Sequence, residues 1–375
     1  MKFNVAGKTF QQQLQAVSKV INSKNTLSIL DNFLLRVEGN TLFITGSDQE
    51  NVMTASLEIF DSEGDGAVAL PAKTLMEITK EIANQPIEIE INDATFQTEI
   101  RFLNGHFNFI GVDPSEYPAK TENDDEITEL IVPASVVQSG IEKTIFAIST
   151  ETIRPIMTGI YWDIHPNDIT FVSSDTHKLV RYINSEVVPG VETSFILAAK
   201  PAGILRSIIT KEDGDVIIRK TATGATFTFG GYSLSVRFIK GNYPNYNRVI
   251  PQDNPYSITV DRLSLLGALR RVALFANKAS SLVRMVFHDN EIRLNCQDLD
   301  FSTSAEELVT CDYSGRPMTI GFNAEFTMQV IGNLPGDSLV IEISDPGRPG
   351  VFRPAEQPEN ENITTIQMPL QVMED

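Results

Sequence analysis

One pattern of strands and helices occurs three times along the 375 residues of this chain. An apolar strand followed by a helical pattern begins at Phe3, at Leu130 and at Tyr256. Later segments match one another at nearly constant spacing, with offsets of 127 and then 123 residues. Because repeated sequences form repeated structures, this threefold repetition constrains the fold more than any local motif does.

The clearest matching segments are NTLFITGSD, NDITFVSSD and NEIRLNCQD. Apolar and polar residues alternate in each of them, which is typical of a half-buried strand. Each segment ends in an acid, and these acids are Asp48, Asp175 and Asp298. Aspartate commonly stabilises turns by accepting hydrogen bonds from the nearby backbone. Since a catalytic residue would not need three copies, we predict a structural role for all three.

Two stretches separate the repeats. Residues 116–130 are acidic and lack periodicity, and residues 243–257 are rich in Pro and Asn, so both are predicted to be linkers. The chain is therefore predicted to contain three domains of ordinary size. Their predicted boundaries are 1–127, 128–252 and 253–375.

Each predicted domain contains two helical patterns that are flanked by short strands. Many strands with only two helices favour an α+β fold, in which the helices cover one side of antiparallel sheets. Sheets of this kind have open edges, which invite pairing with another chain. Three such units could satisfy their free ends by closing into a ring with a second copy, arranged head to tail.

Composition excludes several classes of protein. Cys296 and Cys311 are the only cysteines and lack metal-ligand spacing, so neither a disulfide scaffold nor a zinc site is expected. The first residues lack the apolar core of a signal peptide, and no segment has the apolar length needed to span a bilayer. We expect a cytoplasmic protein with no cofactor, no metal and no membrane partner.

The net charge of −19 argues at first against a nucleic-acid partner, because phosphate is bound by Lys and Arg. The charge is unevenly distributed, however: the six predicted helical segments carry +8, which leaves −27 on the rest of the chain. If the helices share one face, that face meets phosphate in a loose, sequence-independent and salt-sensitive contact. The six segments are residues 7–25, 72–85, 134–148, 199–211, 261–278 and 323–335.

Two groupings of polar residues suggest catalysis, namely Asp175 with His177 and Asp298 with Asp300. Neither lies beside a nucleophile motif such as GxSxG, and the sequence contains no GxxxxGK phosphate loop and no GxGxxG fingerprint. We therefore predict that the protein is not an enzyme and has no catalytic residue.

Motifs in all three thirds of the chain resemble those of the bacterial sliding clamp family, the beta subunits of DNA polymerase III. They keep the family's order and spacing, and together they are specific. The matching segments are the opening MKF, TLSILDNFLL from Thr26, LPAK from Leu70, SSDTHKLV from Ser173, KGNYPNYNRVIP from Lys240, IGFNAEF from Ile320 and QMPL from Gln367.

The resemblance implies three tandem clamp domains in each chain and a head-to-tail homodimer that closes into a ring of six domains. Helices would line a central hole through which duplex DNA passes, so the protein would act as a processivity factor that holds the polymerase on DNA by topology. The implied partners are a second copy of the chain, duplex DNA, the replicative DNA polymerase with other clamp-binding proteins, and a clamp loader.

The resemblance also implies an apolar pocket between the second and third domains that binds a short extended peptide of client proteins. Without the resemblance, the segment from Met368 to Leu370 would be interpreted only as the closing strand of the third core. The chain departs from the family pattern at Thr176 and Lys178, where glycine and arginine are common, and in an acidic tail beside the pocket that ends at Asp375. The pocket residues carried over are Met157, Ser174, Thr176, His177, Lys178, Leu179, Pro244, Arg248, Val249, Asn323, Phe326, Ile366, Met368, Pro369 and Leu370.

Two further sets of residues follow from the resemblance. Each basic residue that it places on DNA could equally be an ordinary solvated charge; these residues are Lys24, Lys73, Arg154 and Lys200. At the dimer interface, aromatic residues on one face of a strand in the first domain would meet the end of a helix in the third. This expectation pairs Phe107 and Phe109 with Leu274 and Phe275, and Arg101 and His106 with Glu306 and Glu307.

A repeat-built protein-interaction scaffold that does not encircle DNA is the alternative interpretation. Ring closure distinguishes the two, because a closed ring stays on circular DNA and slides off linear ends, whereas an open scaffold leaves both forms at the same rate.

Overall fold

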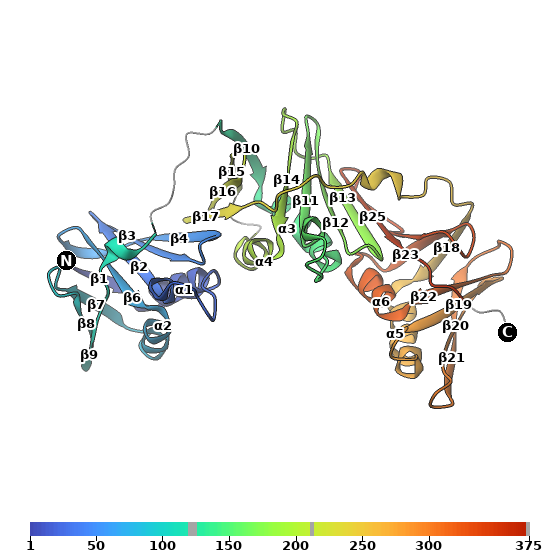
Figure 1. Cartoon of the computed structure of the whole chain (residues 1–375), viewed down its shortest axis with the longest axis horizontal. Helices are drawn as coiled ribbons and strands as arrows, with labels where there is room; N and C mark the ends of the chain where they lie inside the picture. Colours follow the sequence, from blue (N-terminus) through green and yellow to red (C-terminus); the bar gives the residue numbers. More distant parts are fainter. Residues whose placement is uncertain (119–125, 211–213, 373–375) are drawn as a thin grey trace. The chain divides into compact units, whose positions relative to one another are not determined.

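A computed structural model of the chain describes residues 1–118, 126–210 and 214–372 (Figure 1). Some positions named above lie outside the described residues. They are residues 119–125 of the first predicted linker, Lys211 of the fourth predicted helical segment, and Glu374 and Asp375 of the tail.

The same order of elements occurs three times: strand, helix, four strands, helix and three strands, with one additional strand in the first repeat. The first repeat contains β1 (Lys2–Ala6), α1 (Gly7–Ser18), β2 (Asn32–Glu38), β3 (Thr41–Ser47), β4 (Asn51–Glu58), β5 (Phe60–Glu63), β6 (Gly66–Pro71), α2 (Ala72–Glu81), β7 (Pro86–Ile91), β8 (Gln97–Phe102) and β9 (Gly105–Ile110). The second contains β10 (Thr128–Pro133), α3 (Ala134–Thr144), β11 (Gly159–His165), β12 (Asp168–Ser174), β13 (Lys178–Asn184), β14 (Thr193–Ala198), α4 (Ala199–Ile208), β15 (Asp215–Lys220), β16 (Gly224–Phe229) and β17 (Tyr232–Arg237).

The third repeat has the same order as the second. It contains β18 (Tyr256–Asp261), α5 (Arg262–Val272), β19 (Leu282–His288), β20 (Glu291–Asp298), β21 (Thr303–Asp312), β22 (Met318–Asn323), α6 (Ala324–Asn333), β23 (Ser338–Ile343), β24 (Gly350–Pro354) and β25 (Glu361–Gln367). Short 3₁₀ helices lie between these elements: η1 (Ser28–Asp31), η2 (Pro114–Glu116), η3 (Ile145–Ala147), η4 (Pro155–Met157), η5 (Tyr246–Arg248) and η6 (Ala273–Phe275). The predicted threefold repetition, with two helices in each repeat, is thus confirmed.

The six helices begin at the predicted residues or one residue later, but all of them end earlier than predicted. Lys19, Lys24 and Lys278 therefore follow helices instead of lying in them. The helices as observed carry a net charge of +5 rather than +8. Part of the net positive charge that was predicted for the helices therefore lies in the segments that follow them.

Side-chain caps define the starts of the two helices in the third repeat. Asp261 precedes α5 and accepts a hydrogen bond from the backbone N of Ser264 at 2.7 Å. Asn323 precedes α6 and accepts from the backbone N of Phe326 at 3.0 Å. Both side chains satisfy backbone donors that a helix leaves free in its first turn.

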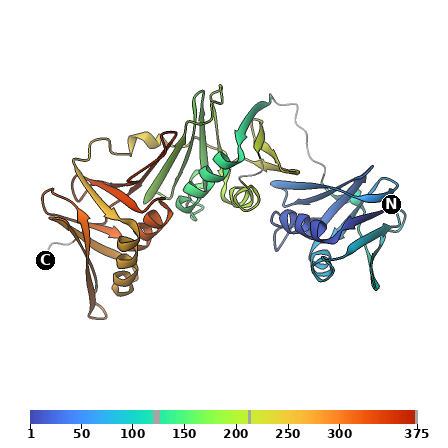
Figure 2. The same ribbon diagram turned by 180° about the vertical axis from the view of Figure 1, so that it is seen from behind.

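The described residues form two compact units, residues 1–138 with 203–238 and residues 139–202 with 239–375. The first unit holds two antiparallel sheets, in the orders β5-β1-β7-β8-β9 and β10-β15-β16-β17-β4-β3-β2-β6. Its helices α1 and α2 lie side by side (Figure 1), and Figure 2 shows the same pair from behind. Phe10 and Leu14 of α1 are fully buried and face the core.

The second unit is built on a sheet in the order β14-β11-β12-β13-β25-β24-β23-β18-β21-β20-β19-β22. Helices α5 and α6 lie side by side in it (Figure 2). Two strand pairings join strands of different repeats into one sheet. In the first unit, β17 pairs with β4, and Leu234 lies opposite Met53. In the second unit, β13 pairs with β25, and Leu179 lies opposite Ile366. The compact units therefore do not coincide with the repeats.

The three repeated aspartates each hold a turn. Oδ1 of Asp48 accepts hydrogen bonds from the backbone N of Glu50 and of Asn51, at 3.1 and 2.7 Å. Oδ1 of Asp175 accepts from the backbone two and three residues later at 3.0 and 2.8 Å, and Oδ1 of Asp298 does so at 3.0 and 3.3 Å. The predicted structural role of the three acids is thus confirmed.

Candidate functional site

The turn between β12 and β13, in the second unit, is held by hydrogen bonds to both side chains and backbone. Oγ of Ser174 accepts from the backbone N of Thr176 at 3.1 Å and donates to the backbone O of Lys178 at 2.9 Å. The backbone N of Asp175 donates to the same Lys178 oxygen at 3.3 Å. Within this turn Thr176 has a φ of +77°, which is uncommon for a residue with a branched Cβ.

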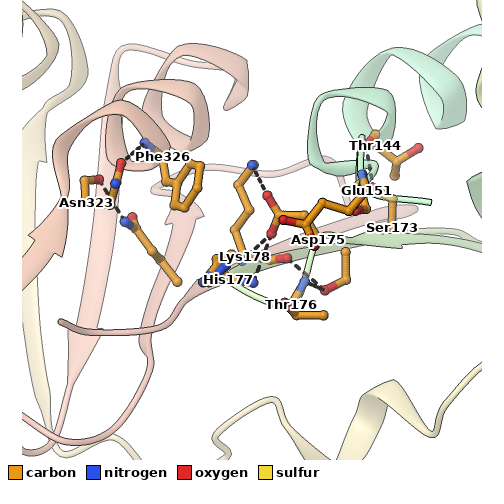
Figure 3. A network of polar contacts seen from close by, with 12 residues as sticks. Thr144, Glu151, Ser173, Asp175, Thr176, His177, Lys178, Asn323 and Phe326 are labelled. Atoms are coloured by element: carbon orange, nitrogen blue, oxygen red, sulfur yellow. Dashed lines mark hydrogen bonds and ion pairs between the residues drawn. The ribbon is translucent and has the colours of Figure 1, made fainter. Parts of the chain in front are cut away.

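Lys178 links this turn to helix α6 (Figure 3). Its side chain is only 4% exposed although it carries a charge. The ammonium pairs with the Asp175 carboxylate and lies 4.3 Å from the centroid of the Phe326 ring. The His177 ring stacks on the same Phe326 ring, with centroids 5.5 Å apart. A buried charge persists where it has such partners, so this cluster fixes the turn against α6.

The end of β25 is attached to the same cluster. The side-chain Nε2 of Gln367 donates to the backbone O of Asn323 at 3.0 Å. The backbone N of Met368 donates to the backbone O of His177 at 2.8 Å. Four segments of the second unit, namely the β12–β13 turn, β25, β22 and α6, are thereby connected by direct polar contacts.

The segment from 239 to 252 adds aromatic side chains. The ring of Tyr243 stacks on Tyr161 with centroids 4.7 Å apart, and the hydroxyl of Tyr246 donates to Oδ2 of Asp163 at 2.8 Å. Burial raises the pKa of both Tyr243 and Tyr246, and the nearby Asp163 carboxylate raises that of Tyr246 further. Both hydroxyls therefore stay protonated at neutral pH.

These segments surround a cavity of about 230 Å³ in the second unit. Its walls are mainly apolar, and the polar groups come from the β12–β13 turn and the 239–252 segment. Cavities that combine apolar walls with a few polar groups are typical ligand sites. The lining residues are Met157, Ser174, Thr176, His177, Lys178, Leu179, Tyr243, Pro244, Asn245, Tyr246, Val249, Ile366 and Met368.

Most residues of the predicted pocket line this cavity. Asn323 and Phe326 do not line it, but they hold the wall through the contacts described above. Arg248 is exposed on η5 and, like Pro369 and Leu370, is not among the lining residues. Sequence reasoning missed Tyr243, Asn245 and Tyr246, although the KGNYPNYNRVIP segment contains all three.

The residues predicted to contact DNA lie in both units. Lys24 follows α1 and Lys73 is the second residue of α2, and both are exposed in the first unit. Arg154 is exposed just before η4, and Lys200 is the second residue of α4; both belong to the second unit. Lys73 and Lys200 thus occupy the same place in two repeats. That the four residues contact DNA stays a prediction.

The residues predicted for the dimer interface lie near two free strand edges. Among the described strands, β9 pairs only with β8, and the stretch of β21 before Cys311 pairs only with β20. Phe107 and Phe109 are half-buried on one face of β9, and the Phe107 ring stacks on Phe102 with centroids 5.0 Å apart. On η6, Leu274 is 82% exposed and Phe275 is exposed as well.

The charged members of that set already have partners within the chain or lie exposed. Arg101 pairs with three acids of its own sheet, which raise its pKa: Glu88, Glu90 and Glu99. Glu307 accepts two hydrogen bonds from Arg271, at 3.0 and 2.5 Å, and this contact lowers the pKa of Glu307. His106 and Glu306 are exposed.

The groupings that suggested catalysis have structural roles. His177 donates its backbone N to Asp175, whereas its ring stacks on Phe326. Asp298 holds a turn, and its Oδ1 accepts the backbone N of Asp300. Among the described residues, no group of three or more His, Cys, Asp or Glu side chains could hold a metal ion. In the same part of the chain, every helix is too short or too polar to cross a membrane.

Three parts of the chain match, in order, the three domains of the DNA polymerase III beta subunit. Residues 1–121 match the N-terminal domain, residues 131–245 the central domain and residues 247–371 the C-terminal domain. Together the matches extend over nearly the whole chain.

Individual relatives match over their full length. The beta sliding clamp of Staphylococcus epidermidis is 26% identical over 380 residues, which cover 99% of each chain. The solved sliding clamp of Pseudomonas aeruginosa bound to griselimycin is 23% identical with a TM-score of 0.94, and the match covers 99% of this chain and all of that one. The clamp of Bartonella birtlesii bound to griselimycin is 26% identical with a TM-score of 0.92, at the same coverage.

Proposed function

Because the chain belongs to the DNA polymerase III beta subunit family, we propose that it is a sliding clamp, which encircles duplex DNA without sequence specificity and tethers the replicative polymerase. The observation that carries this proposal is that one order of elements occurs three times and each repeat matches a different domain of the family. The role proposed is that of a cytoplasmic processivity factor, not of an enzyme.

Client proteins are proposed to bind at the cavity in the second unit. An extended peptide could place apolar side chains against Leu179, Ile366 and the two lining methionines, which adapt to different shapes. Polar groups of the β12–β13 turn and of Asn245 at the rim could fix its backbone. Lys178 would act here through Phe326 and the turn, because its ammonium is already paired.

Ring closure is proposed to join two copies head to tail through the free edge of β9 and the free edge of β21. Phe107 and Phe109 supply apolar surface at the first edge, and Leu274 supplies it near the second. A symmetric pair of such contacts leaves neither edge open. The ion pairs of Arg101 and Glu307 within the chain support an interface whose strength comes from strand pairing and apolar contact.

Contact with DNA is proposed to be weak and electrostatic. The observed helices carry +5 in a chain of net charge −19, and Lys24, Lys73, Arg154 and Lys200 are the proposed contacts. A ring needs no tight phosphate contact, because topology retains it on DNA. A clamp loader that opens the ring is a further partner implied by this function.

Retention on DNA tests the proposal. Fluorescent protein loaded on nicked circular DNA is expected to stay bound for many minutes and to be released when a restriction enzyme linearises the DNA. Sedimentation of the free protein is expected to give a dimer at micromolar concentration. A monomer that leaves circular and linear DNA at the same rate would instead favour the scaffold that does not encircle DNA.

Peptide binding tests the cavity separately. Deleting residues 368–375 removes Met368 from the cavity wall and its bond to His177, so the affinity for a client peptide is expected to be lost while the dimer persists. Griselimycin, which is bound in the two relatives described above, gives a second probe and is expected to compete with the peptide. Unchanged peptide affinity after the deletion would remove this cavity as the client site.

A further inference from the structure

We infer that Thr176 limits the size of the apolar side chain that the cavity accepts, an inference that rests on the proposed binding of client peptides. Thr176 lines the cavity and is nevertheless exposed, so it lies at the cavity's mouth. Its φ of +77° is in the left-handed region, which costs free energy for a residue with a Cβ, above all a branched one. Glycine would adopt this backbone without that cost.

The turn imposes this conformation on whichever residue follows Asp175. The backbone N groups of Thr176, His177 and Lys178 all donate to side chains within the turn. The backbone O of His177 accepts from Met368, and the backbone O of Lys178 accepts from Asp175 and Ser174. A backbone with this many fixed contacts keeps its shape when one side chain changes.

The first repeat contains the same turn with a different residue. Gln49 has a φ of +79° and donates its backbone N to Oγ of Ser47 at 3.1 Å, as Thr176 does to Ser174. Asp48 accepts the next two backbone N groups, as Asp175 does. The first and second repeats therefore share the strained backbone, whereas only the residue in the second repeat lines the cavity. The chain thus offers its own control.

The cavity wall combines adaptable residues with a rigid one. Met157 and Met368 are unbranched side chains that can change shape to fit a ligand. Thr176 is branched at Cβ, which restricts its χ1, and it stands on a turn that cannot move without breaking several hydrogen bonds. The rigid residue sets the limit on size, because the adaptable side chains change shape first.

The experiment measures size selectivity with three labelled peptides that differ only in one apolar anchor: leucine, phenylalanine or tryptophan. Dissociation constants are measured by fluorescence anisotropy for the wild-type dimer and for T176G, T176V and Q49G. We expect the wild-type preference for leucine over tryptophan to fall about tenfold in T176G, the range in which a pocket discriminates by a small change of volume. T176V keeps the branched shape and is expected to keep the preference, as is Q49G, which relieves the same strain elsewhere.

The outcomes separate the inference from the function on which it rests. A T176G protein that binds leucine and tryptophan peptides in the wild-type ratio, to within about twofold, would overturn the inference and leave client binding intact. Loss of the preference in T176V would also overturn it, because the hydroxyl and not the volume would then be responsible. If the wild-type protein binds none of the peptides, client binding at this cavity fails, and the inference fails with it.

Discussion

The ammonium of Lys178 lies 4.3 Å from the centroid of the Phe326 ring, so a charge at the start of β13 rests against the first turn of α6. The contact joins the second repeat to the third inside one compact unit. The same ring carries His177 on its face, and the same ammonium is paired with Asp175. The contacts of these few side chains therefore hold the wall of the cavity in place, and replacing one of them is expected to change both stability and peptide binding.

Replacing Lys178 by methionine keeps an unbranched side chain, shorter by one atom, but removes its charge. The Asp175 carboxylate, whose side chain is 13% exposed, then loses its partner, which is expected to lower the free energy of unfolding by about 1–3 kcal/mol. The affinity for a client peptide is expected to fall, because the turn and Phe326 are no longer held together. Urea unfolding and fluorescence anisotropy measure the two effects. K178R keeps the charge and is expected to resemble the wild type; a K178M protein of wild-type stability would show that the ion pair does not hold the turn.

The hydrogen bond between Tyr246 and Asp163 fixes the 239–252 segment to β11 at 2.8 Å. Y246F keeps the buried ring but removes the donor, and a bond to a charged acceptor contributes about 1.5–3 kcal/mol. Urea unfolding is expected to show a loss of that size. Tyr161 offers a control, because its hydroxyl lies 3.4 Å from the other oxygen of Asp163; Y161F is expected to lose less. Equal losses of stability in Y246F and Y161F would contradict the conclusion that the hydrogen bond from Tyr246 to Asp163 fixes the segment.

The two cysteines predict a dependence of stability on alkaline pH. Cys296 and Cys311 are 1% and 8% exposed, and burial raises the pKa of both thiols from 9.0 to about 11. The folded state therefore holds the neutral thiols, while the unfolded chain begins to ionise near pH 9. This contribution to stability is complete below pH 9 and is lost as the pH rises toward 11.

Urea unfolding at pH 8, 9 and 10 checks this dependence. The wild-type protein is expected to lose more stability over that range than the C296A/C311A variant, since all other titrating groups are common to both. Thiol reagents at pH 8 are expected to label the native cysteines slowly and the urea-unfolded ones at once. Parallel declines of the two proteins would rule out the thiols as the cause.

Leu274 tests the proposed dimer interface, because it is 82% exposed in the single chain. A charge there is expected to leave the fold of the chain unchanged. At a buried interface an unpaired charge is costly, so L274E is expected to weaken the dimer by about 100-fold or more, as sedimentation velocity measures it. V188E, at a position that is 69% exposed and outside the proposed interface, is the matched control. An L274E protein that stays dimeric would show that Leu274 does not lie in the dimer interface.

Helix starts could be predicted from the sequence, whereas helix ends could not. Each helix follows directly from a short strand, and that change from alternation to helical spacing marks its first residue. After Ser18, however, residues 19–24 continue a pattern compatible with a helix, whereas the backbone N groups of Lys19, Val20 and Ile21 bond to carbonyls three residues earlier, a tightening that local spacing does not encode. The predicted helical charge was too high for this reason.

The candidate site could be predicted where motifs marked it. Tyr243 and Tyr246 were missed because their burial arises when a Pro- and Asn-rich segment packs onto a sheet formed by distant strands. That Arg101 faces another chain stays a prediction; within its own chain, strand register places it opposite Glu88 and beside two further acids, which the sequence did not indicate. These contacts depend on the register of β7 against β8, which the conformation of the loop between the two strands fixes and the alternation of residues alone does not.

Strands β10, β15, β16 and β17 of the middle repeat complete a sheet with the first repeat, and β11 to β14 complete another with the third. The middle repeat is therefore one repeat in the sequence, but its strands belong to two different sheets. We expect its two halves to unfold with different neighbours and not as one cooperative unit. A destabilising change in β16 would be transmitted to the first repeat, and one in β12 to the third. Excising the middle third would remove β17 and β13 and leave their partners β4 and β25 with unpaired edges, so the chain cannot be divided into thirds without opening a sheet.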